Sequence, residues 1–228
     1  MLTVTDATFD ARLRARLLGV VAVIAALGLA VELWAWRALE GDALVEPAWT
    51  LLSLSGEGNL PTWLASSLLL GCALAAGAIA GELPVGAPWR RHWWGVAAGL
   101  AFVSMDEVVG LHEQLGGTFG TGGVLYFDWV LIAGPVVAAL ALVYLPFVRA
   151  LPAPVRDRLV VAAVVFVSGA LVMELPLGWW TERAGTHTLG YALIDWVEET
   201  LELVGTCLAL VALVAHRRSP HRPPGGAA

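Results

Sequence analysis

Long, nearly uninterrupted apolar segments are the feature that most constrains how this chain can fold. The segments lack the polar alternation of membrane-barrel strands, and each matches the roughly 20 residues that a helix needs to cross a bilayer. They cover Leu17–Ala38, Pro61–Ala80, Trp93–Glu113, Leu125–Val148, Leu159–Trp180 and Ala192–Ala215. The segments therefore predict an all-α fold, an integral membrane helical bundle of about six transmembrane helices.

The composition favours a single membrane domain. Hydrophobic residues make up 58% of the 228 residues and charged residues only 14%, against a charged share of about a quarter in soluble domains. We predict one six-helix transmembrane domain over residues 1–216 and a disordered, proline- and glycine-rich cytoplasmic tail over residues 217–228. The net charge of −6 argues against nucleic acid as a partner.

The arginines predict the orientation of the bundle. There is no lysine, so all thirteen basic residues are arginine, and loops rich in arginine stay in the cytoplasm. If six helices alternate in direction, one side of the membrane carries Arg37 and Arg183 alone. The opposite side then carries Arg12, Arg14, Arg16, Arg90, Arg91, Arg149, Arg156, Arg158, Arg217, Arg218 and Arg222. This asymmetry predicts that both the N- and C-termini are cytoplasmic.

Smaller features concern packing. Asn59 and Pro61 mark the start of the second predicted helix, and the short, semi-apolar segment 47–55 is predicted not to span. Cys72 and Cys207 fall within apolar segments, where a small buried residue is expected rather than a disulfide. Small residues, which let helices approach closely, recur at a spacing of four; they are Ala73, Gly77, Gly81, Gly95 and Gly99. The lipid bilayer is the expected partner, and a homo-oligomer formed through these small-residue faces is a further prediction.

Carboxylates inside the predicted helices are the main indication of function. On this topology they fall in the outer half of the bilayer, where an acid exposed to lipid costs several kcal/mol, so they are expected to face one another or water. Helical geometry puts Asp106 and Glu113 on one face and groups the acids of the last helix within an arc of about 100°. The candidate site comprises Asp106, Glu107, His112, Glu113, Glu174, Asp195, Glu198, Glu199 and Glu202.

Several acids also have simpler explanations. Glu32, Asp128 and Glu113 lie near predicted helix ends, where a hydrated interface residue is the more economical interpretation. Asp195 suits the first turn of a helix, where the helix dipole favours an acid. The deeper acids lack such an explanation, so a functional polar site is the default for them; they are Asp106, Glu107, Glu174, Glu199 and Glu202.

Three kinds of function are compatible with such a site. Oxygen ligands from several helices suit Mg²⁺, Ca²⁺ or Mn²⁺, so we predict a divalent metal ion, of unknown identity, as cofactor, with hydrolysis of a lipid-like substrate as the accompanying reaction. The alternative is a proton- or cation-coupled transporter, because intramembrane acids also form ion relays. The third is a non-catalytic bundle whose polar core serves assembly. Whether the protein is an enzyme stays open, since no P-loop, CxxC or HExxH motif occurs.

Three segments together resemble a family of uncharacterised bacterial multi-pass inner-membrane proteins. They are residues 57–63 (EGNLPTW), residues 104–113 (SMDE, then HE) and residues 198–202 (EETLE). The family combines a GN(I)PTW segment, an SxDE…HE helix and a terminal EExxE helix. The resemblance covers roughly residues 50–215. It implies a multi-pass protein of the bacterial cytoplasmic (inner) membrane and no particular activity.

Overall fold

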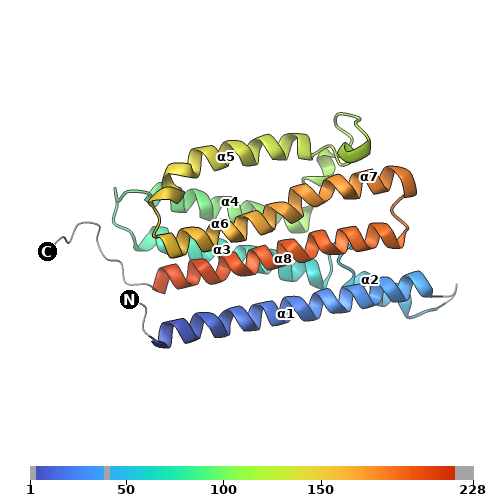
Figure 1. Cartoon of the computed structure of the whole chain (residues 1–228), viewed down its shortest axis with the longest axis horizontal. Coiled ribbons are helices and arrows are strands. Elements are labelled where there is room, and N and C mark those ends of the chain that lie inside the picture. The colour runs from blue at the N-terminus through green and yellow to red at the C-terminus, as the bar shows by residue number, and fades with distance from the viewer. Residues whose placement is uncertain (1–3, 39–41, 219–228) are drawn as a thin grey trace.

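The structure is a computed structural model that describes residues 4–38 and 42–218, and this part of the chain is helical without strands. Figure 1 shows long helices lying side by side. They are α1 (Val4–Arg37), α2 (Val45–Leu52), α3 (Leu60–Glu82), α4 (Arg90–Val109), α5 (Val130–Ala150), α6 (Ala153–Val167), the π-helical turn η3 (Ser168–Met173), α7 (Glu174–Ala184) and α8 (Leu189–Arg218), with short 3₁₀ turns η1 (Glu113–Leu115) and η2 (Gly123–Leu125). The all-α prediction is confirmed. Arg217 and Arg218 complete α8, and the remainder of the predicted tail, with Arg222, lies outside the described residues.

Four helical stretches among the described residues are long and apolar enough to cross a membrane. They are Thr8–Arg37, Leu60–Glu82, Val130–Ala150 and Ala153–Ala184, the last of which joins α6, η3 and α7. Helices α4 and α8 lie in the same bundle but are not among these four stretches. The structure therefore supports a membrane protein, while six spans and the cytoplasmic position of the termini stay predictions.

Two predicted helix boundaries are wrong at the same loop. Helix α4 ends at Val109 because Gly110 adopts a left-handed conformation with φ of 62°, which an L-residue with a side chain rarely tolerates. His112 and Glu113 therefore lie beyond the helix, not within it. Helix α5 begins at Val130 and not at Leu125, since the preceding residues are held in a loop by Asp128. The start of α3 follows prediction: the Asn59 side chain caps it by accepting a hydrogen bond from the Thr62 N–H at 3.1 Å.

The two ends of the bundle differ in charge. The end that holds both described chain ends and the loop 83–89 is here called the arginine end (Figure 1). The guanidinium of Arg218 lies 3.8 Å from the ring centroid of Phe9 there, which brings the end of α8 beside the start of α1. The opposite end, with segments 53–59, 110–129 and 185–188, is called the acidic end. Most predicted site residues lie toward it.

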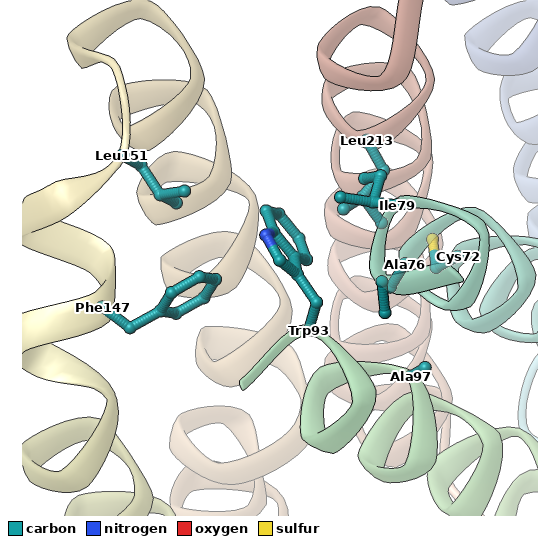
Figure 2. Packing of buried hydrophobic residues seen from close by; sticks show 9 residues of the cluster. Cys72, Ala76, Ile79, Trp93, Ala97, Phe147, Leu151 and Leu213 are labelled. Carbon is teal, nitrogen blue, oxygen red and sulfur yellow. The ribbon is translucent and has the colours of Figure 1, made fainter. Parts of the chain in front are cut away.

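The larger apolar core lies toward the arginine end. Trp93 of α4 is buried there, with its ring in edge contact with Phe147 of α5 at 5.0 Å between centroids. Figure 2 shows Leu213 of α8 and Ile79 of α3 on the other side of the indole ring. This core occupies the half of the bundle that lacks the acids.

A smaller core joins α1, α3 and α8 through Val21, Leu68 and Leu203. Both cysteines are buried and free, as the sequence predicts, and Cys72 Sγ lies 3.5 Å from the Thr206 backbone oxygen.

Helix α5 turns much of its surface away from the other helices. Leu142 and Val143 are 71% and 63% exposed in the isolated chain. A large exposed apolar surface of this kind is unfavourable in water and is expected to contact lipid. Gly81 and Gly99 also have open space where a side chain would begin, so the oligomer formed by small-residue faces stays a prediction.

Candidate functional site

Helices α3 and α4 are fastened together just before the site begins. Ser66 Oγ donates a hydrogen bond to the Ser104 backbone oxygen at 2.7 Å, and Ser104 Oγ donates one to the Ser66 backbone oxygen at 2.8 Å. Reciprocal bonds of this kind hold polar groups of two helices together within a membrane. They fix the part of α4 from which Asp106 and Glu107 project.

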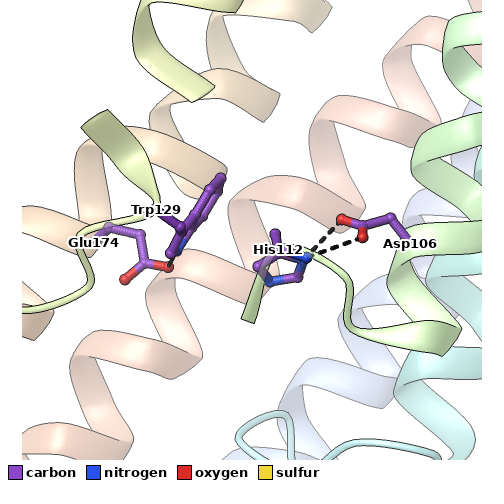
Figure 3. Close-up of polar contacts among 4 residues, drawn as sticks. All are labelled: Asp106, His112, Trp129 and Glu174. Carbon is purple, nitrogen blue, oxygen red and sulfur yellow. Dashed lines mark hydrogen bonds and ion pairs between the residues drawn. The ribbon is translucent and has the colours of Figure 1, made fainter. Parts of the chain in front are cut away.

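A chain of polar contacts crosses the acidic end from α4 to α7. His112 Nδ1 lies 2.7 Å from Asp106 Oδ2, and the His112 backbone N–H donates to Asp106 Oδ1 at 3.2 Å. The imidazole packs on the Trp129 ring with centroids 4.8 Å apart, and Trp129 Nε1–H donates to Glu174 Oε1 at 2.9 Å. Figure 3 shows His112 and Trp129 between the two carboxylates. Two acids 68 positions apart in sequence thus belong to one site.

Glu174, Asp195 and Glu198 form a buried triad between α7 and α8. They are 8%, 8% and 7% exposed, and their charges interact with one another. One oxygen of each, Glu174 Oε2, Asp195 Oδ2 and Glu198 Oε2, is buried without a hydrogen-bond partner in the described structure. An unpartnered buried carboxylate oxygen is costly, so the triad has unused capacity for a proton or another cation.

The arginines at this end do not neutralise the triad. The guanidinium of Arg37 lies 6.0 Å from the Trp36 ring centroid, and that of Arg183 lies 4.1 Å from the Trp179 ring centroid. Arg183 also donates a hydrogen bond to the Trp179 backbone oxygen at 3.0 Å. Because burial disfavours an ionised carboxylate that has no counter-ion, the triad suits protons or a bound cation.

Glu107, Glu199 and Glu202 continue the acidic group toward the middle of the bundle. The charges of Glu199 and Glu202 interact with each other and with Glu107 of α4. Glu202 packs closely on η3: a side chain at Gly169 would begin 2.8 Å from Glu202 Cγ and 2.7 Å from the Glu198 backbone oxygen. The glycine therefore lets the helix that carries Glu174 approach the acids of α8.

Glu57 and Glu113 form a more accessible pair next to His112. Their carboxyl groups share a hydrogen bond, which together with partial burial and the nearby negative charge raises the pKa of Glu57 from 4.5 to about 7. Glu57 comes from the loop before α3 and Glu113 from the loop after α4. The pair therefore offers a carboxyl group that exchanges its proton near neutral pH at the exposed edge of the site.

Replacing Glu113 with glutamine is expected to return the pKa of Glu57 toward 4.5, because the amide can donate to the Glu57 carboxylate and carries no charge. In the wild type, Glu57 binds more protons in the folded state than in the unfolded state between about pH 4.5 and 7. Its contribution to stability is therefore fully present below pH 4.5 and is lost as the pH rises through about 7. Infrared titration of the carboxyl band that disappears in Glu57→Gln measures the pKa. Glu46→Gln, an exposed acid of α2, is the matched control, and a Glu57 band that titrates near 4.5 in the wild type would contradict the shared hydrogen bond.

Asp128 has a structural role at the same end. It is completely buried and accepts hydrogen bonds from the backbone N–H groups of Gly117 at 2.8 Å, Phe119 at 2.7 Å and Gly120 at 3.1 Å. Burial raises the pKa of its carboxyl group, but the backbone donors outweigh burial and hold the pKa below its ordinary value of 3.8. The anionic carboxylate thus holds the loop that positions Trp129 next to Glu174. The interpretation of Asp128 as a hydrated interface residue is wrong.

A pocket of about 410 Å³ opens beside the triad at the acidic end. Its lining includes Glu32 and Trp36 of α1, Trp49 of α2, Ser55, and Tyr191 of α8. Glu32 is only 6% exposed and accepts a hydrogen bond from Ser53 Oγ, so it too is not the hydrated interface residue that its position suggested. Its charge interacts with that of Asp195, which links the pocket to the triad.

The structure thus gathers the nine predicted residues at the acidic end and toward the middle of the bundle. Residues that sequence reasoning left out of the site are Glu32, Glu57, Trp129 and Tyr191. Glu57 stands in the EGNLPTW segment, which was the available indication. Within residues 4–38 and 42–218, no group of three or more histidine, cysteine, aspartate or glutamate side chains is arranged to hold a metal ion.

Comparison with known proteins gives a family without an assigned activity. A family model described as a domain of unknown function (DUF8692) matches residues 15–217. No curated protein and no solved structure matches the chain significantly.

Proposed function

Because the chain belongs to the DUF8692 family, a domain of unknown function, its activity has to be inferred from the site, and we propose that it is a proton-coupled membrane transporter. The acids of α4, α7 and α8 take up and release protons at the acidic end. The pocket beside them holds a small solute with a cationic group. The proton and the cationic solute compete for the negative charge of the carboxylates. The protein therefore moves the proton in one direction across the membrane and the solute in the other.

The observation that carries this proposal is the buried triad with its three unpartnered oxygens. Glu174, Asp195 and Glu198 are more than nine-tenths buried, and within the part of the chain that the structure describes none of them forms an ion pair with an arginine. Intramembrane acids of this kind are characteristic of ion and proton pathways, because they are too costly to keep for packing alone. A site that needs a counter-ion and lies next to an open pocket suits an exchange of cations.

The pocket supports a cationic solute. The face of an indole ring attracts cations, and the pocket combines Trp49 with the carboxylate of Glu32. Since the charges of Glu32 and Asp195 interact, a cation in the pocket favours the ionised form of Asp195 and so promotes proton release. By reciprocity, protonation of the triad weakens binding of the cation.

The depth of the acids supports movement into the bundle. Glu202 follows the start of α8 by thirteen residues, which corresponds to roughly 20 Å along the helix. The hydrocarbon core of a bilayer is about 30 Å thick, so the acidic residues extend at least to its middle. Beyond them lies the apolar core around Trp93, which would have to open for release at the arginine end.

Reconstituted vesicles test the proposal. Radiolabelled tetraethylammonium uptake, driven by a proton gradient and monitored with an internal pH dye, is expected to fall at least tenfold in Asp195→Asn and in Glu198→Gln, in line with the loss of a residue essential to coupling. Glu46→Gln at the same end is expected to keep wild-type uptake. Loss of uptake in all three variants, or uptake that does not depend on the gradient, would contradict the proposal.

The same preparations test the alternative proposal that the protein is a divalent-metal hydrolase. One observation supports this alternative. The unpartnered oxygens of the triad are hard ligands of the kind that Mg²⁺ or Ca²⁺ prefers. Elemental analysis that finds a stoichiometric metal, lost in Asp106→Asn and Glu199→Gln, would favour a metal site over proton exchange. Proton-coupled uptake by metal-free protein would favour the transporter.

A further inference from the structure

A second pocket, of about 330 Å³, lies at the arginine end, apart from the acidic residues. Its floor is α8, through Leu208 and Val211, and its walls are Arg14 of α1 and Arg158 of α6. Figure 1 shows α8 between α1 and α6, so the pocket is a groove between two outer helices over a third. Val211 is 7% exposed, which closes the floor of the groove toward the interior.

The two arginines reach this groove from helices that are far apart in sequence. Both are exposed, and within the described residues neither guanidinium has a hydrogen bond or an ion pair. Asp10 also lines the groove, so its side chains carry a net positive charge of one. Two planar guanidinium groups with free donors suit the oxygens of a phosphate group.

The groove continues into surface that suits acyl chains. Val161, at its edge, and Val164, one turn further along α6, are 54% and 59% exposed. Both flanking helices belong to stretches that are apolar enough to cross a membrane. The arginines therefore stand where a headgroup lies, and the valines stand where its chains lie.

We infer that this groove binds an anionic phospholipid, with its phosphate between Arg14 and Arg158 and its acyl chains along α6 and α8. Basic pockets between transmembrane helices are known to select anionic headgroups. This inference does not rest on the proposed transport function, because no residue of the acidic end takes part.

Native mass spectrometry of the detergent-purified full chain tests the inference. At 150 mM salt, which screens exposed charges beyond about 8 Å, the wild type is expected to retain one phosphatidylglycerol in preference to phosphatidylcholine of the same chain length. The double variant R14Q/R158Q is expected to bind phosphatidylglycerol about ten- to thirtyfold more weakly, on the basis of roughly fivefold per arginine. R14K/R158K should fall between the two, because it keeps the charge and loses the planar fork.

The chain offers a matched control two positions away on each helix. R12Q/R156Q removes the same charge from α1 and α6. A spacing of two residues corresponds to a rotation of about 200° around a helix, so Arg12 and Arg156 point away from the groove. This variant is expected to stay within about twofold of the wild type. Equal losses in both pairs would mean diffuse attraction to negative charge, equal binding of phosphatidylcholine would mean no headgroup selection, and displacement by millimolar inorganic phosphate would mean a free-anion site. Each of these results would overturn the inference, as would unchanged binding in a folded R14Q/R158Q protein.

Discussion

Gly205→Ala is expected to lower the free energy of unfolding by about 1–3 kcal/mol, as overpacking in a close-packed interior does. A Cβ atom at position 205 of α8 would lie 2.6 Å from the backbone nitrogen and 2.8 Å from the Cα of Phe166. Backbone atoms of α6 cannot rotate away as a side chain would, so the two helices must separate. Leucine at this position is expected to prevent the packing of α6 on α8 and to abolish the folded protein.

Gly99→Ala provides the same chemical change without the contact. Gly99 lies in α4, and no atom lies within 4 Å of the position that its Cβ would take. Alanine is the better helix former by about 1 kcal/mol, so this variant is expected to be as stable as the wild type or more stable. Thermal unfolding in detergent, followed by circular dichroism, compares the two. A stable Gly205→Ala protein would show that α6 and α8 pack less closely than described.

Asp128→Ala is expected to release the whole loop before α5. Three backbone N–H groups lose the buried carboxylate that accepts from them, and hydrogen bonds to a charged group are the stronger kind. Amide exchange at residues 117–120 is expected to accelerate by about two orders of magnitude. Because Trp129 follows directly, its hydrogen bond to Glu174 is expected to be lost as well.

Asparagine at position 128 separates charge from shape. Its single carbonyl oxygen can replace one carboxylate acceptor, so Asp128→Asn is expected to show an intermediate exchange rate. Asp157→Ala serves as control, since Asp157 is an exposed residue paired with Arg156 at the arginine end. Hydrogen–deuterium exchange with mass spectrometry measures all three variants, and unchanged protection of residues 117–120 in Asp128→Ala would contradict the role of the carboxylate.

Local rules predicted much of the fold. Apolar length gives the helices, and Asn59 with Pro61 gives the start of α3 because capping depends on neighbours in sequence. Apolar length alone predicted that the third helix continues to Glu113. The helix ends at Val109 instead, because Gly110 adopts a positive φ, which the sequence does not reveal. The π-helical turn within the fifth predicted helix has no comparable local indication.

The position of acids deep within apolar segments predicted the candidate site, but the sequence did not predict which other residues contact those acids. Asp106, Glu174 and Glu199 stood out because an acid within an apolar segment is costly wherever it points. Trp129 and Asp128 depend on a loop that folds back over the bundle, and no spacing along the chain reveals that contact. Glu32 was assigned to the interface because it lies near a helix end, whereas α2 and Ser53 cover it in the folded chain.

The π-helical turn at Ser168–Met173 changes the direction in which the side chains of α7 point relative to those of α6. A turn of this kind accommodates one additional residue, and each residue of an α-helix contributes about 100° of rotation. Without it, the buried face of α7 that carries Glu174, Leu177 and Gly178 would be rotated by about a quarter of a turn. One additional residue of backbone therefore sets the direction in which the acid of the fifth predicted helix points, and with it the hydrogen bond of Glu174 with Trp129.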